Sequence, residues 1–183
     1  MPKSLDSIII VAIICIMIVA VYTDLRSRKI PNQLTYSAMV FLLAYYTTAY
    51  GFAGCWFSVK GLLLGTGILV PVYLIGGMGA GDAKLMGVVG AALGWHGVFT
   101  AFLFTALLGG LYALVLILFR YKQCKEILER STLMMKLFVY SKKVFFIPGT
   151  QNGNAPKLCY AIPIAIGTAG AVAWCMAYSR YLI

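Results

Sequence analysis

Two of the five carboxylates in this 183-residue chain, Asp24 and Asp82, stand where they could do chemistry. Each lies at the boundary of a long apolar tract, Asp24 in the stretch YTDLRSRKIPNQLT and Asp82 in GGMGAGDAKL. Two carboxylates held together in a partly dry site cannot both ionise easily, so they share one proton. The ionised carboxylate can act as a base toward a water molecule, while the protonated one polarises a carbonyl group. Such a pair hydrolyses an amide bond without a metal ion, a cysteine or a serine.

Each of these aspartates also has an ordinary structural explanation. A negative charge at the C-terminal end of a helix is disfavoured by the helix dipole, so Asp24 could simply pair with Arg26 or Arg28. Asp82 could be the N-cap of the helix that follows it, with Lys84 reaching to the membrane interface. The two aspartates taken together favour hydrolysis more than either does alone. The remaining carboxylates are expected to be solvated charges: Asp6, Glu126 and Glu129.

Both aspartates are flanked by residues that free or restrict the backbone. Glycines at positions 76, 77, 79 and 81 remove side chains, permit positive φ and let another backbone approach closely. A loop that grips an extended peptide beside a carboxylate has that requirement, and so has a tight turn between packed helices. After Asp24, Ile30-Pro31-Asn32 provides a rigid stop, because proline makes the preceding residue extended and Asn32 can cap the next helix.

The other reactive side chains do not form a second site. The five cysteines contain no CxxC pair and no His/Cys cluster with metal-ligand spacing, so we expect neither a metal nor a cofactor. The single histidine, His96, falls on the opposite side of the membrane from Ser27 and Ser37 in the topology given below. A serine–histidine pair would have to cross the bilayer, so we expect His96 to have an interfacial or packing role.

The composition excludes an ordinary soluble protein. Hydrophobic residues make up 62% of the chain, charged residues only 11%, and the mean hydropathy is +0.91. Since a helix needs about 20 apolar residues to cross a hydrocarbon core, the uncharged tracts predict several membrane-spanning helices. We expect an all-α, polytopic protein with about six transmembrane helices in one domain, residues 1–183. The expected spans lie near 5–22, 34–52, 57–76, 83–96, 98–119 and 159–179.

The fourth and fifth of these spans share one uncharged tract, residues 85–119. A helix of that length would be about 52 Å long, which is too long for a single crossing. The sequence Gly94-Trp95-His96-Gly97 offers a break, with tryptophan at a headgroup boundary. A turn nearer Gly109-Gly110 is the alternative.

The distribution of basic residues predicts the orientation. If the basic segment 120–158 faces the cytoplasm, a six-span topology places the loops 23–33 and 77–84 on the same side. These three regions contain twelve of the fifteen lysines and arginines. We therefore expect a multi-pass plasma-membrane protein with Asp24 and Asp82 at the cytoplasmic face and both termini external. The net charge of +10 then reports topology rather than binding to nucleic acid.

In the segment 120–158, basic residues alternate with apolar clusters, as in KEILERSTLMMKLFVYSKKVFFIPG. This pattern fits a helix lying on an anionic membrane leaflet. A solvated basic loop that is anchored at both ends fits it equally well.

At these residues the chain resembles the GxGD intramembrane aspartyl peptidases. Gly79-Ala80-Gly81-Asp82, followed by Lys84, is similar to their signature. Asp24-x-Arg26 followed by IPN resembles the first-aspartate motif of the type IV prepilin peptidase branch. The stretch 159–167, CYAIPIAIG, resembles the proline-containing start of that family's last helix. The likeness covers roughly residues 10–180.

The resemblance implies an aspartic endopeptidase that cleaves prepilin-like precursors at the cytoplasmic face, between a short basic leader and an apolar helix. Asp24 and Asp82 would be the catalytic pair, Gly79 and Gly81 would shape the active-site loop, and Lys84 would support it. The implied partners are the precursor, the lipid bilayer and pilus-assembly components. The apolar segment of the precursor would lie against the membrane spans of the enzyme.

Larger members of that family carry an N-terminal cytoplasmic domain with paired CxxC motifs and also N-methylate the new amino terminus. This chain enters its first apolar tract almost at once and has no such cysteines. It therefore resembles the small, peptidase-only form of tight-adherence (Flp) pilus systems, and we expect no methyltransferase activity.

Three other interpretations remain at this stage. A preflagellin-type GxGD peptidase would carry the same motifs and act on another substrate. A non-enzymatic membrane component of a pilus or secretion assembly would use the basic segment as its working surface. A small transporter is disfavoured because neither aspartate lies in the middle of a span.

Overall fold

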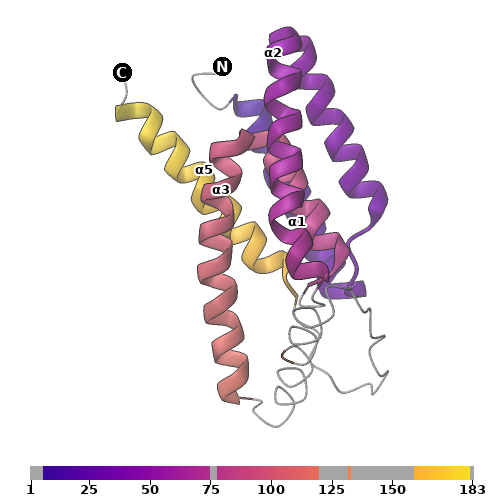
Figure 1. Ribbon diagram of the computed structural model, residues 1–183, viewed down its shortest axis with the longest axis vertical. Coiled ribbons are helices and arrows are strands. Elements are labelled where there is room, and N and C mark those ends of the chain that lie inside the picture. The colour runs from indigo at the N-terminus through magenta and orange to yellow at the C-terminus, as the bar shows by residue number, and fades with distance from the viewer. Residues whose placement is uncertain (1–5, 75–77, 120–131, 133–158, 182–183) are drawn as a thin grey trace.

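The computed structural model describes residues 6–74, 78–119, 132 and 159–181, and these residues are almost entirely helical. The prediction of an all-α protein is confirmed. The basic segment 120–158 lies outside the described residues except for Thr132, so both interpretations of that segment stay predictions. The helices are α1 (Ser7–Ser27), α2 (Asn32–Leu74), α3 (Ala80–Phe119) and α5 (Ala161–Tyr181) (Figure 1).

α2 consists of two helices that meet at Gly51, where φ is 62° and ψ is −148°. A straight helix of 43 residues would be about 64 Å long, roughly twice the thickness of a hydrocarbon core. Beyond Gly51 the chain turns back, so that Gly54 packs against the backbone carbonyl of Tyr46. The two arms, residues 32–50 and 52–74, therefore form a hairpin (Figure 1).

α3 is interrupted in the same way at Gly94, where φ is 69° and ψ is −174°. This confirms the predicted break at Gly94-Trp95-His96-Gly97, whereas the alternative at Gly109-Gly110 is wrong because both residues lie inside the second arm, 95–119. Glycine is required at position 94 for two reasons, the positive φ and the ring of Phe57, which fills the space of a side chain.

The apolar helices fit a membrane protein. Among the residues that the structure describes, three helices are long and apolar enough to cross a bilayer: α1, α2 and the part of α3 that ends at Val115. A shorter apolar helix covers 161–177. The first arm of α3, residues 80–93, is about 21 Å long and so shorter than the hydrocarbon core. The number of six spans stays a prediction.

The centre of the fold is the contact between the second arm of α2 and the first arm of α3. Gly61 and Gly90 let the two backbones touch, and Gly65 packs on the carbonyl of Met86. Small residues at such contacts are the usual means of close helix packing in membranes. The hydroxyl of Ser58 donates to the carbonyl of Ala91 at 2.9 Å. This packing fixes the first arm of α3, which carries Asp82 in its first turn.

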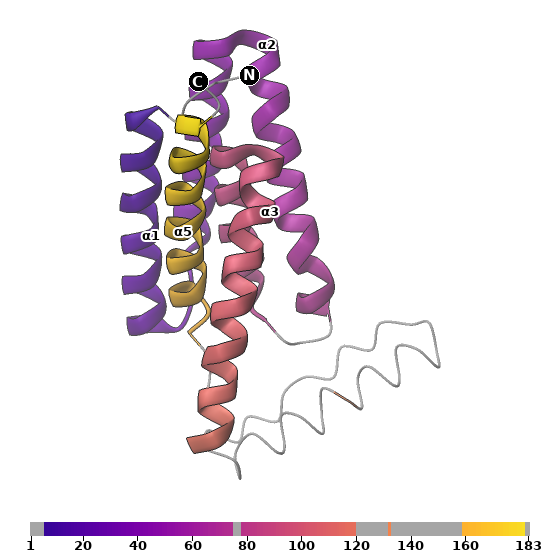
Figure 2. The same cartoon turned by 90° about the vertical axis from the view of Figure 1, so that its left-hand side faces the viewer.

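α1 presents one buried stripe to the rest of the molecule. Its members recur every three or four residues, as expected for one face of a helix: Ile9, Ile13, Met17, Ala20 and Asp24. Asp24 is therefore the last residue of an otherwise apolar inner face. The packing of α1 turns this carboxylate inward, toward α5, which lies beside α1 (Figure 2).

The prediction that Asp6 is a solvated charge is wrong. Its carboxylate oxygen Oδ2 accepts hydrogen bonds from the hydroxyls of Tyr45, at 2.9 Å, and Tyr50, at 2.8 Å. Both tyrosines belong to the first arm of α2, close to the turn at Gly51. Asp6 thus joins the start of α1 to α2, and its charge is stabilised by two hydroxyl donors.

Candidate active site

Asp24 and Asp82 line the same pocket, which has a volume of about 240 Å³. Each residue is only 8% exposed. The structure thus brings together the two carboxylates that the sequence singles out, from the end of α1 and the start of α3. The rest of the pocket is formed by the IPN turn and the glycine loop: Arg28, Lys29, Ile30, Asn32, Gly79, Ala80 and Gly81.

Asp24 is held from the other side by α5. The backbone N–H of Ala161 donates to Oδ2 of Asp24 at 3.4 Å. Ala161 is the first residue of α5, where backbone N–H groups have no partner within the helix and the helix dipole favours a negative charge. The unfavourable position of Asp24 at the C-terminal end of α1 is therefore offset by the N-terminal end of α5.

The structure does not show the pairing of Asp24 with an arginine that its ordinary structural explanation requires. The guanidinium of Arg26 donates instead to the hydroxyl of Tyr22 at 3.0 Å. Among the described residues, no ion pair to Asp24 is present. Arg28 ends α1 in the left-handed conformation, with φ 50°, and its backbone N–H donates to the carbonyl of Asp24 at 2.8 Å. Its exposed side chain lies at the edge of the pocket.

Asp82 is the third residue of α3, so the alternative prediction that it is the N-cap of this helix is wrong. Its Oδ2 accepts from the backbone N–H of Gly79 at 3.2 Å, and its own N–H donates to the carbonyl of Gly79 at 3.1 Å. A side chain at the third position that reaches back to the residue before the helix is one half of a capping box. The carboxylate is thereby fixed by the loop that precedes it.

The glycines of the loop are required for close approach rather than for an unusual backbone. Neither Gly79 nor Gly81 has a positive φ. A Cβ atom at position 81 would lie 3.1 Å from Cβ of Ile30, and one at position 79 would lie 3.3 Å from Oδ2 of Asp82. Gly76 and Gly77 lie outside the described residues. The glycine loop and the IPN turn therefore touch directly at the pocket.

Lys84 joins the same two segments on the outside of the pocket. Its Nζ donates to Oδ1 of Asn32 at 2.8 Å and lies 4.9 Å from the centre of the Tyr36 ring. The side-chain oxygen of Asn32 is thus engaged by Lys84, and the prediction that it caps the next helix is wrong. Lys84 does not line the pocket, and its supporting role stays a prediction.

Two neighbours of the pocket were missed by sequence reasoning. The stretch CYAIPIAIG had drawn attention through its resemblance, but nothing in it showed that the amide of Ala161 meets Asp24. Cys159, which precedes α5, is the second neighbour. Burial raises the pKa of its thiol, the charge of Asp24 raises it further, and Arg28 opposes these effects. A raised pKa keeps the thiol protonated, unlike the thiolate of a reactive cysteine.

His96 lies just beyond the break at Gly94, at the start of the second arm of α3. From Asp82 to Leu93 the first arm extends about 17 Å, so His96 lies near the opposite end of that arm from Asp82. The His96 ring packs on the ring of Trp95, in line with its predicted interfacial or packing role. Among the described residues, no group of three or more potential ligands could hold a metal ion.

Known proteins match the part of the chain that contains this pocket. A model of the type IV leader peptidase family matches residues 11–114, which include both aspartates. A prepilin leader peptidase/N-methyltransferase of Bacillus subtilis (strain 168) is 31% identical over 120 residues, which cover 63% of this chain and 47% of that protein. The chain thus spans about half the length of this curated relative. No solved structure matches the chain. Because the family model covers more than half of the 183 residues, the chain belongs to the type IV leader peptidase family.

Proposed function

We propose that this protein is a membrane aspartyl endopeptidase that removes the leader peptide from type IV prepilin-like precursors. The observation that carries the proposal is the single pocket lined by two nearly buried carboxylates, Asp24 and Asp82. Family membership and the name of the Bacillus subtilis relative support the same reaction and the same class of substrate.

The proposed reaction divides one proton between the two aspartates. The ionised carboxylate removes a proton from a water molecule, and the resulting hydroxide attacks the carbonyl carbon of the scissile peptide bond. The protonated carboxylate donates to the carbonyl oxygen, which becomes a hydroxyl of the tetrahedral intermediate. When the C–N bond breaks, a proton passes to the leaving amine and the pair is restored.

The surroundings of the two carboxylates fit a site that holds a negative charge. Asp24 accepts from Ala161 at the start of α5, and Asp82 lies in the first turn of α3. Each carboxylate is therefore close to a helix N-terminus, where a negative charge is favoured. We assign one proton and one negative charge to the pair as a whole, because two carboxylates that line one small pocket cannot both ionise easily.

We further propose that the pocket faces the cytoplasm, with both termini external and several passes through the plasma membrane. The support for this orientation is the distribution of charge, since most lysines and arginines fall in the loops on the side of Asp24 and Asp82. The lysine and arginine residues at the pocket edge, Arg28 and Lys29, belong to that basic side. Contacts with pilus-assembly components would also be made from it.

The decisive experiment is co-expression with a candidate prepilin, followed by N-terminal sequencing of the product. Asp24→Asn and Asp82→Asn should each lower the cleavage rate by about 10³-fold or more, because each aspartate makes one of the two proton transfers that form the tetrahedral intermediate. The asparagine oxygen can still accept from Ala161 or Gly79, so membrane insertion should be retained. Asp6→Asn is the matched control, since this half-buried carboxylate is also hydrogen-bonded but lies at the other end of α1. Near wild-type cleavage by either of the first two variants would refute the proposed pair.

The absence of CxxC pairs in the chain supports a peptidase without methyltransferase activity. The mass of the mature pilin distinguishes the two cases. We expect an unmodified amino terminus when this chain is the sole processing enzyme in the cell. A product heavier by one methyl group would contradict this part of the proposal.

A further inference from the structure

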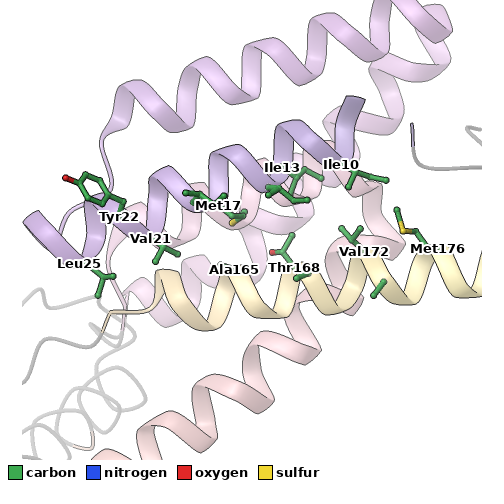
Figure 3. Close-up of a pocket in the computed structure, with 14 residues that line it drawn as sticks. Ile10, Ile13, Met17, Val21, Tyr22, Leu25, Ala165, Thr168, Val172 and Met176 are labelled. Carbon is green, nitrogen blue, oxygen red and sulfur yellow. The ribbon is translucent and has the colours of Figure 1, made fainter. Parts of the chain in front are cut away.

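A second and larger hollow lies on the outer face of the molecule, between α1 and α5. It has a volume of about 610 Å³, and its lining is almost entirely apolar. Figure 3 shows its two walls, with Leu25 and Tyr22 near one end and Met176 near the other. We call this hollow the α1/α5 groove.

The α1 wall of the groove includes Ile13 and Met17 of the inner stripe and, beside them, a second stripe. The second stripe repeats the inner stripe one residue later: Ile10, Ile14, Ile18, Val21 and Leu25. One residue is a rotation of 100° around a helix, so this stripe points away from the core. Ile14 is 52% exposed, Ile18 is 63% exposed and Leu25 is 58% exposed. An apolar stripe of this kind, beside a facing helix, is shaped to pack against another apolar element.

The α5 wall has the small side chains that admit a helix. Ala165, Ala169 and Ala173 recur every four residues and line the groove. Small residues at this spacing let a neighbouring helix approach closely within a membrane. The hydroxyl of Thr168 donates to the carbonyl of Ile164 at 2.7 Å, so it offers no free donor to the groove. No charged residue lines the groove, which excludes a polar occupant.

The groove begins beside the carboxylate pocket on both walls. On α1, the groove residue Leu25 directly follows Asp24. On α5, Ala165 lies one turn, or about 6 Å, beyond Ala161, whose amide donates to Asp24. The groove then follows α1 from Leu25 to Ile10, a length of about 22 Å along the helix axis. A helix of some 15 residues would fill that length.

We propose that the α1/α5 groove binds the apolar helix of the precursor, with the N-terminal end of that helix beside Asp24. This inference rests on the proposed function, because a leader peptidase must place the bond between the leader and the apolar segment at the carboxylates. A helix in the groove leaves its first residues at Asp24, so the preceding bond enters the pocket in extended form. A lipid acyl chain would also fill an apolar groove. However, an acyl chain has no reason to lie beside the carboxylates, whereas the precursor helix must begin there.

Site-specific photo-cross-linking tests this inference. A photoreactive residue is placed at Ile18, in the groove, in full-length protein that carries Asp82→Asn, so that uncleaved precursor accumulates. The matched control is the same residue at Leu107, which is 72% exposed on α3 and does not line the groove. We expect cross-links from Ile18 to the precursor to exceed those from Leu107 by about tenfold. Cross-links only to lipid, only to a second copy of the enzyme, or equally from both positions would overturn the inference.

A kinetic measurement distinguishes a failure of this inference from a failure of the proposed function. Ala169 is exposed on the groove wall, so Ala169→Leu fills the groove without disturbing the core. We expect this variant to raise KM for the intact precursor about tenfold, and to raise it less for a short peptide that lacks the apolar helix. Leu107→Phe, outside the groove, should leave KM for the precursor unchanged. If the wild-type protein cleaves the precursor and Ala169→Leu cleaves it with the same KM, only the groove assignment fails. If the wild-type protein cleaves no precursor, the proposed function fails, and cross-linking still reports whether the groove binds it.

Discussion

The contact between Gly81 and Ile30 offers a direct test of how tightly the two aspartates are positioned. A Cβ atom at position 81 would lie 3.1 Å from Cβ of Ile30, whereas carbon atoms in contact normally stay about 3.5–4.0 Å apart. Gly81→Ala must therefore move the glycine loop away from the IPN turn by about half an ångström. Asp82 directly follows position 81, so its carboxylate moves with the loop.

The size of the effect follows from this displacement. A misplacement of 1 Å at a catalytic site can lower the rate about 10²-fold, so a shift of half that size should lower kcat about tenfold. Gly81→Val adds two further methyl groups. The Cβ position that carries them already lies only 3.5 Å from Cγ1 and 3.6 Å from Cδ1 of Ile30. We expect this variant to lose about 10²-fold or more.

The assay is cleavage of purified precursor by purified enzyme, with folding followed by thermal melting. Ile30→Ala removes the atoms that the two added methyl groups would meet but keeps Cβ, so it should restore part of the activity of Gly81→Val and little of that of Gly81→Ala. Gly67→Ala is the control, because no atom lies within 4 Å of the added Cβ. Full activity of Gly81→Val, or a loss that Ile30→Ala leaves unchanged, would refute the claim that this contact positions Asp82.

Three further predictions concern residues outside the pocket. Asp6→Ala should lower the melting temperature while cleavage continues, because it removes the acceptor of two tyrosine hydroxyls far from the carboxylate pair; loss of cleavage in well-folded protein would contradict this. Gly61→Ala should destabilise the fold by about 1–3 kcal/mol, because the new Cβ would overlap the carbonyl of Gly90, whereas Gly67→Ala should melt like the wild-type protein. Cys159→Ala should retain activity, and a thiol-alkylating reagent should not inhibit the wild-type enzyme, because the raised pKa of Cys159 keeps it from acting as a nucleophile; inhibition that Cys159→Ala abolishes would contradict this.

That Asp24 and Asp82 line one pocket was predictable, because few carboxylates occur in this chain and these two stand at span boundaries. The inner stripe of α1 is visible in the sequence as apolar residues three or four positions apart, and it ends at Asp24. A break in the uncharged tract 85–119 was predictable from its length, which exceeds one crossing, and the sequence Gly94-Trp95-His96-Gly97 indicated its place. Local pattern and chain length therefore carried these predictions.

Contacts between distant segments were not predictable in this way. Asp6 was expected to be solvated, because nothing near it in sequence indicates that Tyr45 and Tyr50 reach it from the next helix. Asn32 was expected to cap a helix, but its side chain is held by Lys84 from another element. In each case the competing partner is 39 or more positions away, and a single sequence carries no signal for such a pair.

The N-terminal half of α5 connects the two parts of the proposed mechanism. Its first amide holds Asp24, and one turn later the same helix begins to line the groove. A precursor helix that packs against Ala165 and Ala169 therefore contacts the helix whose first amide donates to the Asp24 carboxylate. Binding in the groove would therefore hold the scissile bond beside Asp24, which would favour cleavage of precursors with an apolar helix over short peptides that have only the scissile bond.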